Sequence, residues 1–131
     1  MGQSKCLAAA LSYLRKGWSV VPLNAASKIP AVKWLQYQTE RPTSDQVRSW
    51  FTTMPDASIG IITGAISGLV AADLDGEVGL RSAQRLGLSS SVVVKSRRGA
   101  HLYFRHPGYA VKTQAGQIAP GIDVRGDGGL V

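Results

Sequence analysis

Two aspartates stand two residues apart in the segment Ala72-Asp73-Leu74-Asp75-Gly76. The apolar residues before them predict a strand over 69–75, and side chains two apart on a strand share one face. Two ionised carboxylates whose Cα atoms lie about 7 Å apart repel each other, and a hard cation such as Mg²⁺ or Mn²⁺ turns this repulsion into coordination. A pair of such ions can hold both oxygens of an in-line phosphoryl displacement. The alternative, a strand ending in an Asp-Gly turn, explains Asp75 better than Asp73.

His101 and Asp123 stand at the polar phase of two further apolar strands. In 101–105 the alternating Leu and Phe side chains predict a buried face opposite His101, and in 122–125 the alternation puts Asp123 and Arg125 on the polar side. If these strands are neighbours of the 69–75 strand, His101 and Asp123 converge with the aspartate pair on one surface. Taken singly, a strand histidine is more often structural and a lone aspartate more often a cap or turn residue. The conjunction favours a site.

The charged residues are unevenly distributed along the chain. Fifteen Lys and Arg against eight Asp and Glu give a net charge of +7, which favours polyanionic partners such as nucleic acid or nucleotides. No acid occurs between Glu77 and Asp123. That interval carries these bases: Arg81, Arg85, Lys95, Arg97, Arg98, Arg105 and Lys112. Acids gathered beside a basic stretch suit a metal site next to a phosphate-binding surface, although a solvated basic face gives the same pattern.

The turn predicted over 96–99 is itself basic. Lys95, Arg97 and Arg98 flank it, and such side chains can bind a triphosphate or a template backbone. Gly99 lacks a Cβ and would let a ligand approach the main chain closely. A solvated β-turn is the alternative interpretation.

The remaining patterns predict the elements that must position these residues. Ser4 caps a first helix that ends at Gly17, and Thr43 opens a second helix through a capping box. A third helix is expected over 77–86, ending at Gly87. Strands are expected over 18–23, 58–63, 69–75, 91–95, 101–105 and 122–125, with 58–63 and 69–75 paired as a hairpin. The expected fold class is α+β: an N-terminal helical part, then a mainly antiparallel sheet with one helix across it.

The bulk properties restrict the class of protein. A chain of 131 residues with 44% hydrophobic residues fits one domain over 1–131 with a real core, which excludes a disordered tail. The single cysteine excludes an internal disulfide. No apolar run approaches the roughly 20 residues that cross a bilayer, so we expect a soluble, cytoplasmic protein. The chain stops at Val131 as a new strand begins, so we expect a domain that is incomplete at its C-terminus.

Taken in order, these motifs resemble the N-terminal domain of bifunctional DNA primase/polymerases, a family of the archaeo-eukaryotic primase superfamily found in phage and plasmid replication proteins. The family has an acidic Asp-x-Asp/Glu strand, a small-residue-x-His strand and a hydrophobic-Asp strand. This chain carries them as Val70-Ala71-Ala72-Asp73-Leu74-Asp75, Arg98-Gly99-Ala100-His101-Leu102-Tyr103-Phe104 and Gly121-Ile122-Asp123-Val124-Arg125-Gly126-Asp127-Gly128-Gly129. Upstream, Lys28-Ile29-Pro30, Trp34 and Ile59-Gly60-Ile61-Ile62-Thr63-Gly64 stand in matching order.

The resemblance implies a fold and a site. The fold would be an RRM-like antiparallel sheet with flanking helices, truncated here because the family continues past Val131. Asp73, Asp75 and Asp123 would hold two Mg²⁺ or Mn²⁺ ions. His101 would complete the catalytic set by contacting the phosphates of the incoming nucleotide. Weaker candidates for nucleotide or template contacts are Lys28, Lys95, Arg97 and Arg125.

The resemblance also implies a reaction. It would be template-directed nucleotidyl transfer, as DNA primase, DNA polymerase or both, in replication of a phage, plasmid or other mobile element. The expected partners are a single-stranded DNA template, NTP or dNTP, and a helicase domain downstream in the same protein, with no membrane. Two alternatives stay open: a non-catalytic nucleic-acid-binding module of a replication initiator, and another metal-dependent phosphoryl-transfer or phosphodiester enzyme.

Overall fold

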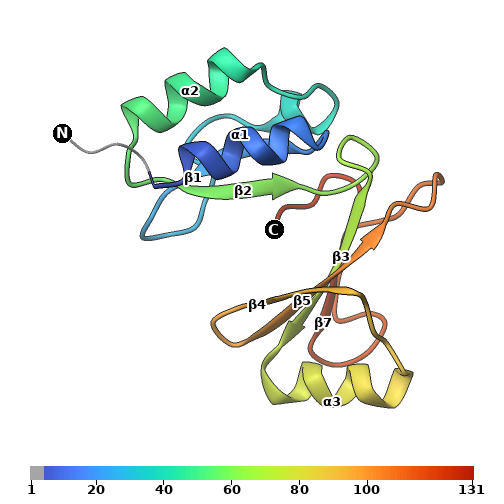
Figure 1. The fold of residues 1–131 in the computed structure, drawn as a ribbon. Helices are drawn as coiled ribbons and strands as arrows, with labels where there is room; N and C mark the ends of the chain where they lie inside the picture. The colour runs from blue at the N-terminus through green and yellow to red at the C-terminus, as the bar shows by residue number, and fades with distance from the viewer. Residues whose placement is uncertain (1–4) are drawn as a thin grey trace. The chain divides into compact units, whose positions relative to one another are not determined.

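The computed structural model describes residues 5–131, which form two compact units (Figure 1). The first unit runs to Ile62 and includes Leu130 and Val131 from the end of the chain. The second unit runs from Thr63 to Gly129. Each unit combines an antiparallel sheet with helical structure, so the α+β class predicted from the sequence is confirmed.

The first unit packs two helices against a two-stranded ribbon. Its elements are α1 (Leu7–Arg15), β1 (Ser19–Leu23), the 3₁₀ helix η1 (Leu35–Gln38), α2 (Ser44–Thr53) and β2 (Ser58–Ile62). Every residue of β1 is buried. The strand contacts α1, α2 and η1 as well as β2, and α1 and α2 lie on the same side of the ribbon (Figure 1). Phe51 and Val47 of α2 are fully buried in this core.

At the helix starts of the first unit, one predicted cap is confirmed and the other falls on a residue that the structure does not describe. Thr43 caps α2, since its Oγ1 accepts a hydrogen bond from the Gln46 backbone N–H at 3.1 Å. Ser4, the expected cap of the first helix, lies outside the described residues. Cys6 occupies the N-cap position of α1 instead, with no side-chain capping bond.

The predicted hairpin between 58–63 and 69–75 is wrong. β2 pairs with β1, with Val20 opposite Ile61, while the strand over 69–75 belongs to the sheet of the second unit. Only one isolated bridge, Gly64 to Leu69, joins the ends of the predicted hairpin. The physical reason is burial: the apolar β1 strand needs a partner that completes its core, and β2 supplies it.

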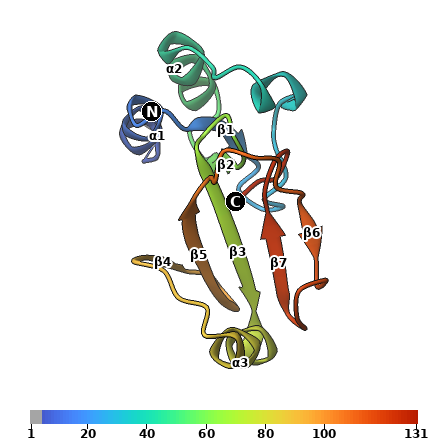
Figure 2. The same ribbon diagram turned by 90° about the vertical axis from the view of Figure 1, so that its right-hand side faces the viewer.

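The second unit is a five-stranded antiparallel sheet with one helix on one face (Figure 2). Its strand order is β4-β5-β3-β7-β6, and β3 (Leu69–Asp75) is central. The other elements are α3 (Gly76–Leu86), β4 (Val92–Lys95), β5 (Gly99–Arg105), β6 (Gln114–Ala115) and β7 (Ile122–Arg125). The β4–β5 hairpin and the Gly87 end of α3, with φ at 66°, were both expected. The short strand β6 was not.

The core of the second unit lies between the sheet and α3. Alternate residues of three neighbouring strands supply it, together with Ala83 of the helix. The buried strand residues are Ala72, Leu74, Ala100, Leu102 and Ile122. The residues between them therefore lie on the opposite face of the sheet.

The last two residues pair with β2 of the first unit. Val131 exchanges two backbone hydrogen bonds with Ile61, at 2.8 and 2.9 Å, and Leu130 bridges Ile62. The sequence predicts a strand beginning at Leu130, and the structure has an isolated β-bridge there. None of the helices formed by residues 5–131 has the length and apolar character needed to span a membrane.

Candidate active site

The register of three strands places His101, Asp73 and Asp123 in one row across the sheet. Asp73 of the central strand β3 lies opposite His101 of β5 on one side and opposite Asp123 of β7 on the other. All three occupy the face of the sheet that α3 does not cover, because their strand neighbours Ala72, Leu102 and Ile122 lie in the core. The strands that the sequence predicts to converge are thus direct neighbours.

Asp73 is the centre of this row. Its Oδ1 lies 3.3 Å from His101 Nε2 and its Oδ2 lies 3.5 Å from Arg125 Nη2. The hydrogen bond with His101 lowers the pKa of the Asp73 carboxyl group below its usual value, against the opposing effect of partial burial, and the charge of Arg125 adds to the lowering. Asp73 is therefore ionised at neutral pH and can act as a metal ligand.

Asp123 is held from its own strand and from the edge strand. Its Oδ1 accepts a hydrogen bond from the Gly116 backbone N–H at 3.1 Å, just after β6. Its Oδ2 lies 3.6 Å from the same Arg125 Nη2 that contacts Asp73. One guanidinium nitrogen therefore lies between two carboxylates of the row.

Asp75 shares the face of Asp73 but occupies a different environment. It is the last residue of β3 and the N-cap of α3, and Gly76 next to it has φ at 61°. Its side chain is 57% exposed, and Oδ1 lies 3.5 Å from Arg98 Nε. Both interpretations of the sequence therefore apply to Asp75: it ends the strand in a turn, and its carboxylate remains on the predicted face.

His101 forms part of a short aromatic ladder along β5. Its ring stacks on Tyr103, with the ring centroids 6.4 Å apart and an angle of 17° between the planes. The side chain of His101 is 22% exposed, so part of the ring remains accessible to solvent. A ring held in this way can present an N–H to an anionic group above the sheet.

The basic turn between β4 and β5 is exposed, as expected. Lys95, Arg97 and Arg98 all lie on the surface, and Ser96 closes the turn by accepting a hydrogen bond from the Gly99 N–H at 3.1 Å. Gly99 has a different role from the predicted one. A Cβ on Gly99 would lie 1.8 Å from the Leu74 carbonyl oxygen, so glycine is required for packing against β3.

Lys28 belongs to the first unit. It has φ at 59°, and its Nζ lies 3.3 Å from Ser58 Oγ. The row of Asp73, His101 and Asp123 belongs to the second unit.

The carboxylates of the row, together with that of Asp75, are the type of ligand that suits a hard divalent cation. Asp73, Asp75 and Asp123 offer only carboxylate oxygens, the ligands that Mg²⁺ and Mn²⁺ prefer. Among residues 5–131, no three His, Cys, Asp or Glu side chains are grouped closely enough to hold a metal ion as they stand. Arg125 supplies the compensating positive charge between two of the carboxylates, and its Nε is buried with no hydrogen-bond partner. The guanidinium therefore lies where a cation would be expected.

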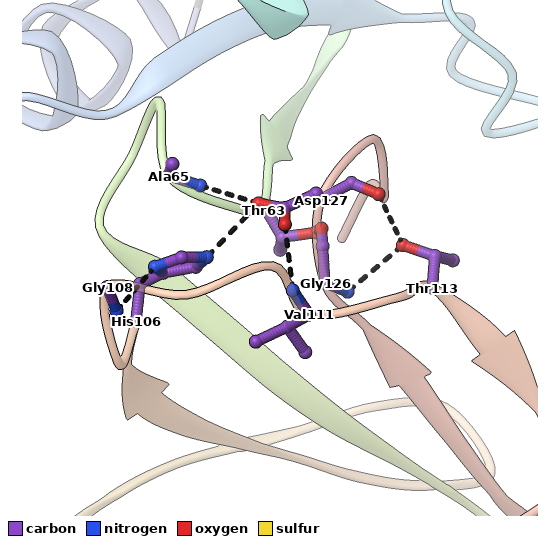
Figure 3. A network of polar contacts seen from close by, with 8 residues as sticks. All are labelled: Thr63, Ala65, His106, Gly108, Val111, Thr113, Gly126 and Asp127. Atoms are coloured by element: carbon purple, nitrogen blue, oxygen red, sulfur yellow. Dashed lines mark hydrogen bonds and ion pairs between the residues drawn. The ribbon is translucent and has the colours of Figure 1, made fainter.

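A second histidine–aspartate pair, His106 and Asp127, was missed by the sequence analysis (Figure 3). His106 Nε2 lies 3.1 Å from Asp127 Oδ1, and its Nδ1 accepts a hydrogen bond from the Gly108 N–H at 3.1 Å. Because that backbone N–H can only donate, the ring carries its proton on Nε2 and donates it to Asp127. Asp127 also accepts bonds from two backbone N–H groups, those of Ala65 and Val111, both at 2.9 Å.

The Asp127 network joins three loops of the second unit. Thr63 Oγ1 donates to the Gly126 carbonyl at 2.7 Å, and Thr113 Oγ1 donates to the Asp127 carbonyl at 3.0 Å. The only signal in the sequence is the glycine-rich setting of Asp127. A Cβ on Gly64 would lie 2.7 Å from Asp127 Oδ1, so a neighbouring glycine allows this close packing.

The comparison with protein families matches most of the chain to a known domain family. The family model described as bifunctional DNA primase/polymerase, N-terminal, matches residues 10–131. The match includes β3, β5 and β7 with the whole row of Asp73, His101 and Asp123. A comparison with curated proteins found nothing that matches the chain.

Proposed function

Because the chain belongs to the family of bifunctional DNA primase/polymerase N-terminal domains, we propose that it catalyses template-directed nucleotidyl transfer at the row of Asp73, His101 and Asp123. Membership of the family indicates a primase/polymerase type of function. The proposal adds the site residues, a two-metal-ion mechanism and the substrates. The observation that carries it is the register: two carboxylates and a histidine stand side by side on three adjacent strands.

The proposed reaction joins a nucleotide to a strand. The 3′-hydroxyl oxygen of a strand, or of an initiating nucleotide, attacks the α-phosphorus of an NTP or dNTP. The bond from that phosphorus to the bridging oxygen of the β-phosphate breaks, and pyrophosphate leaves. Bound Mg²⁺ or Mn²⁺ supplies a lowered hydroxyl pKa and stabilisation of the charge that develops on phosphate oxygens.

The side chains of the row have separate roles in the proposal. Asp73 and Asp123, with Asp75 at the end of the strand, would hold the metal ions. His101 would donate an N–H to the triphosphate, and its stack on Tyr103 helps to orient the ring. Lys95 and Arg97 on the exposed turn attract the nucleotide or the template backbone, as does Lys28 in the first unit.

The proposal extends to the biological setting. The +7 charge supports a single-stranded DNA template as the macromolecular partner. By its resemblance to phage and plasmid replication proteins, the domain acts in the cytoplasm in replication of a mobile element, with a helicase domain further along the same protein.

A strand-synthesis experiment tests the function. The purified chain is incubated with a single-stranded template, with and without a primer, in the presence of Mn²⁺ and NTPs or dNTPs. Product length and pyrophosphate release are measured for the wild type and for Asp73→Asn. Glu77→Gln is the matched control, since Glu77 is exposed on α3 and pairs only with Arg81 in the described contacts. We expect synthesis from the wild type and the control, and none from Asp73→Asn.

Each other outcome selects an alternative. Full activity of Asp73→Asn would overturn the proposed site. Release of phosphate or nucleoside monophosphate in place of pyrophosphate would identify a phosphodiester or phosphoryl-transfer enzyme. Salt-dependent DNA binding that ignores divalent metal, without synthesis, would identify a non-catalytic module, which the basic charge also suits.

A further inference from the structure

Arg125 contacts both carboxylates of the row through a single nitrogen. Nη2 lies 3.5 Å from Asp73 Oδ2 and 3.6 Å from Asp123 Oδ2. Asp123 precedes Arg125 by two residues on β7, and Asp73 lies opposite Asp123 on β3. The guanidinium therefore offsets part of the negative charge of the two carboxylates that the sheet register brings together.

These contacts are weaker than a guanidinium can make. A charge-assisted N–H···O bond is commonly about 2.7–2.9 Å long, and a guanidinium can bind a carboxylate through two parallel bonds. Here neither carboxylate is engaged at that distance. The Arg125 Nε is in addition buried without a hydrogen-bond partner, which carries a desolvation cost. Arg125 is thus held in place mainly by the local negative charge.

A divalent cation between Asp73 and Asp123 would remove that negative charge. The two carboxylates carry two negative charges, which one Mg²⁺ or Mn²⁺ balances alone. Arg125 would then face a cation at short range and would be repelled. Its planar fork of donors matches a phosphate, which is the anion that a nucleotide brings to the same face.

We propose that Arg125 is an exchangeable internal cation: it occupies the place between Asp73 and Asp123 in the metal-free protein, and yields it to the metal ion when it turns to the nucleotide phosphates. The proposal rests on the proposed metal site. It makes Arg125 a positioning residue that opposes metal binding and favours triphosphate binding. Removal of the guanidinium therefore has effects of opposite sign on the two ligands.

Binding of Mn²⁺ to the complete chain tests the first effect. Free Mn²⁺ is measured by electron paramagnetic resonance during titration of the wild type, Arg125→Gln and Arg105→Gln. Arg105 is the matched control: it is exposed on β5, its loss changes the net charge equally, and it pairs in register with Leu69 rather than with an acid. We expect Arg125→Gln to bind Mn²⁺ about tenfold more tightly than the wild type. Arg105→Gln should change the affinity less than about twofold.

Binding of a non-hydrolysable nucleoside triphosphate analogue with saturating Mg²⁺ tests the second effect. We expect Arg125→Gln to weaken it about tenfold, since one bidentate phosphate contact is lost. Unchanged or weaker Mn²⁺ binding by folded Arg125→Gln would contradict the proposal that Arg125 competes with the metal ion. Unchanged binding of the analogue would contradict the proposal that Arg125 contacts the nucleotide phosphates.

A measurement on the wild-type protein tests the proposal without any substitution. In ¹⁵N-labelled protein the Arg125 Nε–H signal should shift when Mg²⁺ is added, while the Arg105 signal stays in place. An Arg125 signal that is unmoved at saturating Mg²⁺ would overturn the proposal. Failure of the proposed function looks different: the wild type would then bind no Mn²⁺ that depends on Asp73 and Asp123, as Asp73→Asn and Asp123→Asn would reveal.

Discussion

The second unit contains two histidine–aspartate pairs that are similar in chemistry and different in support. His101 and Asp73 lie 3.3 Å apart on the open face of the sheet, and Asp73 is bonded only to side chains in the described contacts. His106 and Asp127 lie 3.1 Å apart, with the histidine side chain only 7% exposed, and Asp127 accepts bonds from the main chain of two loops. The first pair has contacts that ligands can replace, and the second has contacts that hold the fold.

The difference indicates how a carboxylate that binds ligands is distinguished from a structural one. Backbone N–H groups that donate to Asp127 cannot turn to another partner without unfolding the loops that carry them. Side chains such as His101 and Arg125 can rotate away from Asp73, and the oxygens are then available to a metal ion. Loss of Asp73 or Asp123 should therefore affect activity more than stability, and loss of Asp127 the reverse.

The largest effect is expected from Asp123→Asn. Loss of a metal ligand should lower the rate of strand synthesis by about 10³-fold or more, which is roughly 4 kcal/mol of transition-state stabilisation. The free energy of unfolding should change by less than about 1 kcal/mol, because the asparagine side chain still offers an oxygen to the Gly116 N–H. Primer extension and urea denaturation measure the two quantities. A variant that is strongly destabilised but retains its specific activity would show that Asp123 has a structural role instead of a catalytic one.

Asp127→Asn should show the opposite balance. An amide can present one oxygen but must direct its N–H₂ group at another donor, so at least one backbone N–H is left without its partner. We expect the free energy of unfolding to fall by about 2–3 kcal/mol. Strand synthesis at low temperature, where the variant stays folded, should remain close to that of the wild type. Catalytic loss without loss of stability would show that this network belongs to the active site.

Substitution of each histidine by glutamine should separate the two pairs in the same way, with smaller effects. His106→Gln should lower the free energy of unfolding by about 1–2 kcal/mol, because the buried ring bridges Asp127 and Gly108. His101→Gln should change it by less than about 0.5 kcal/mol, and should weaken binding of a triphosphate several-fold. Thermal melts and equilibrium binding of a labelled analogue check both. Equal destabilisation by the two substitutions would contradict the distinction.

The smallest effect concerns pH. Hydrogen bonds from Val111 and then Ala65 lower the pKa of Asp127 below its ordinary value of 3.8. A lowered folded-state pKa gives stability that is present above the unfolded value and lost as pH falls through the folded one. The stability difference between wild type and Asp127→Asn should therefore shrink as pH falls below about 5. The decrease should be less than about 1 kcal/mol, because the side chain is 40% exposed. A difference that grows on acidification would contradict this assignment.

Strand alternation explains why most of the candidate site could be predicted. Leu74, Leu102 and Ile122 mark the buried phase of three strands, so their polar neighbours had to share the other face once the strands were adjacent. Pairing partners were less predictable. The run over 58–63 is as apolar as a hairpin strand requires, yet it pairs with β1, because a distant apolar strand offers a better core than the next strand in the chain.

Residues bonded to the main chain were the least predictable. Asp127 stands among glycines and looks like a turn residue, and its partners Ala65 and Val111 lie 62 and 16 positions away. No side-chain pattern marks a backbone N–H as a donor to a distant carboxylate. Arg125 was expected to contact nucleotide or template, but its position between Asp73 and Asp123 depends on the register of β3 and β7.

The sequence by itself determined the α+β class, the likeness to the primase/polymerase family, and the face of each strand on which Asp73, His101 and Asp123 stand. These follow from local periodicity, which acts within a few residues. Only the tertiary structure decided that β3 lies between β5 and β7, that Arg125 bridges two carboxylates, and that Asp127 holds loops together. Those outcomes depend on which distant strands complete a core, and that choice is made by packing of the whole chain.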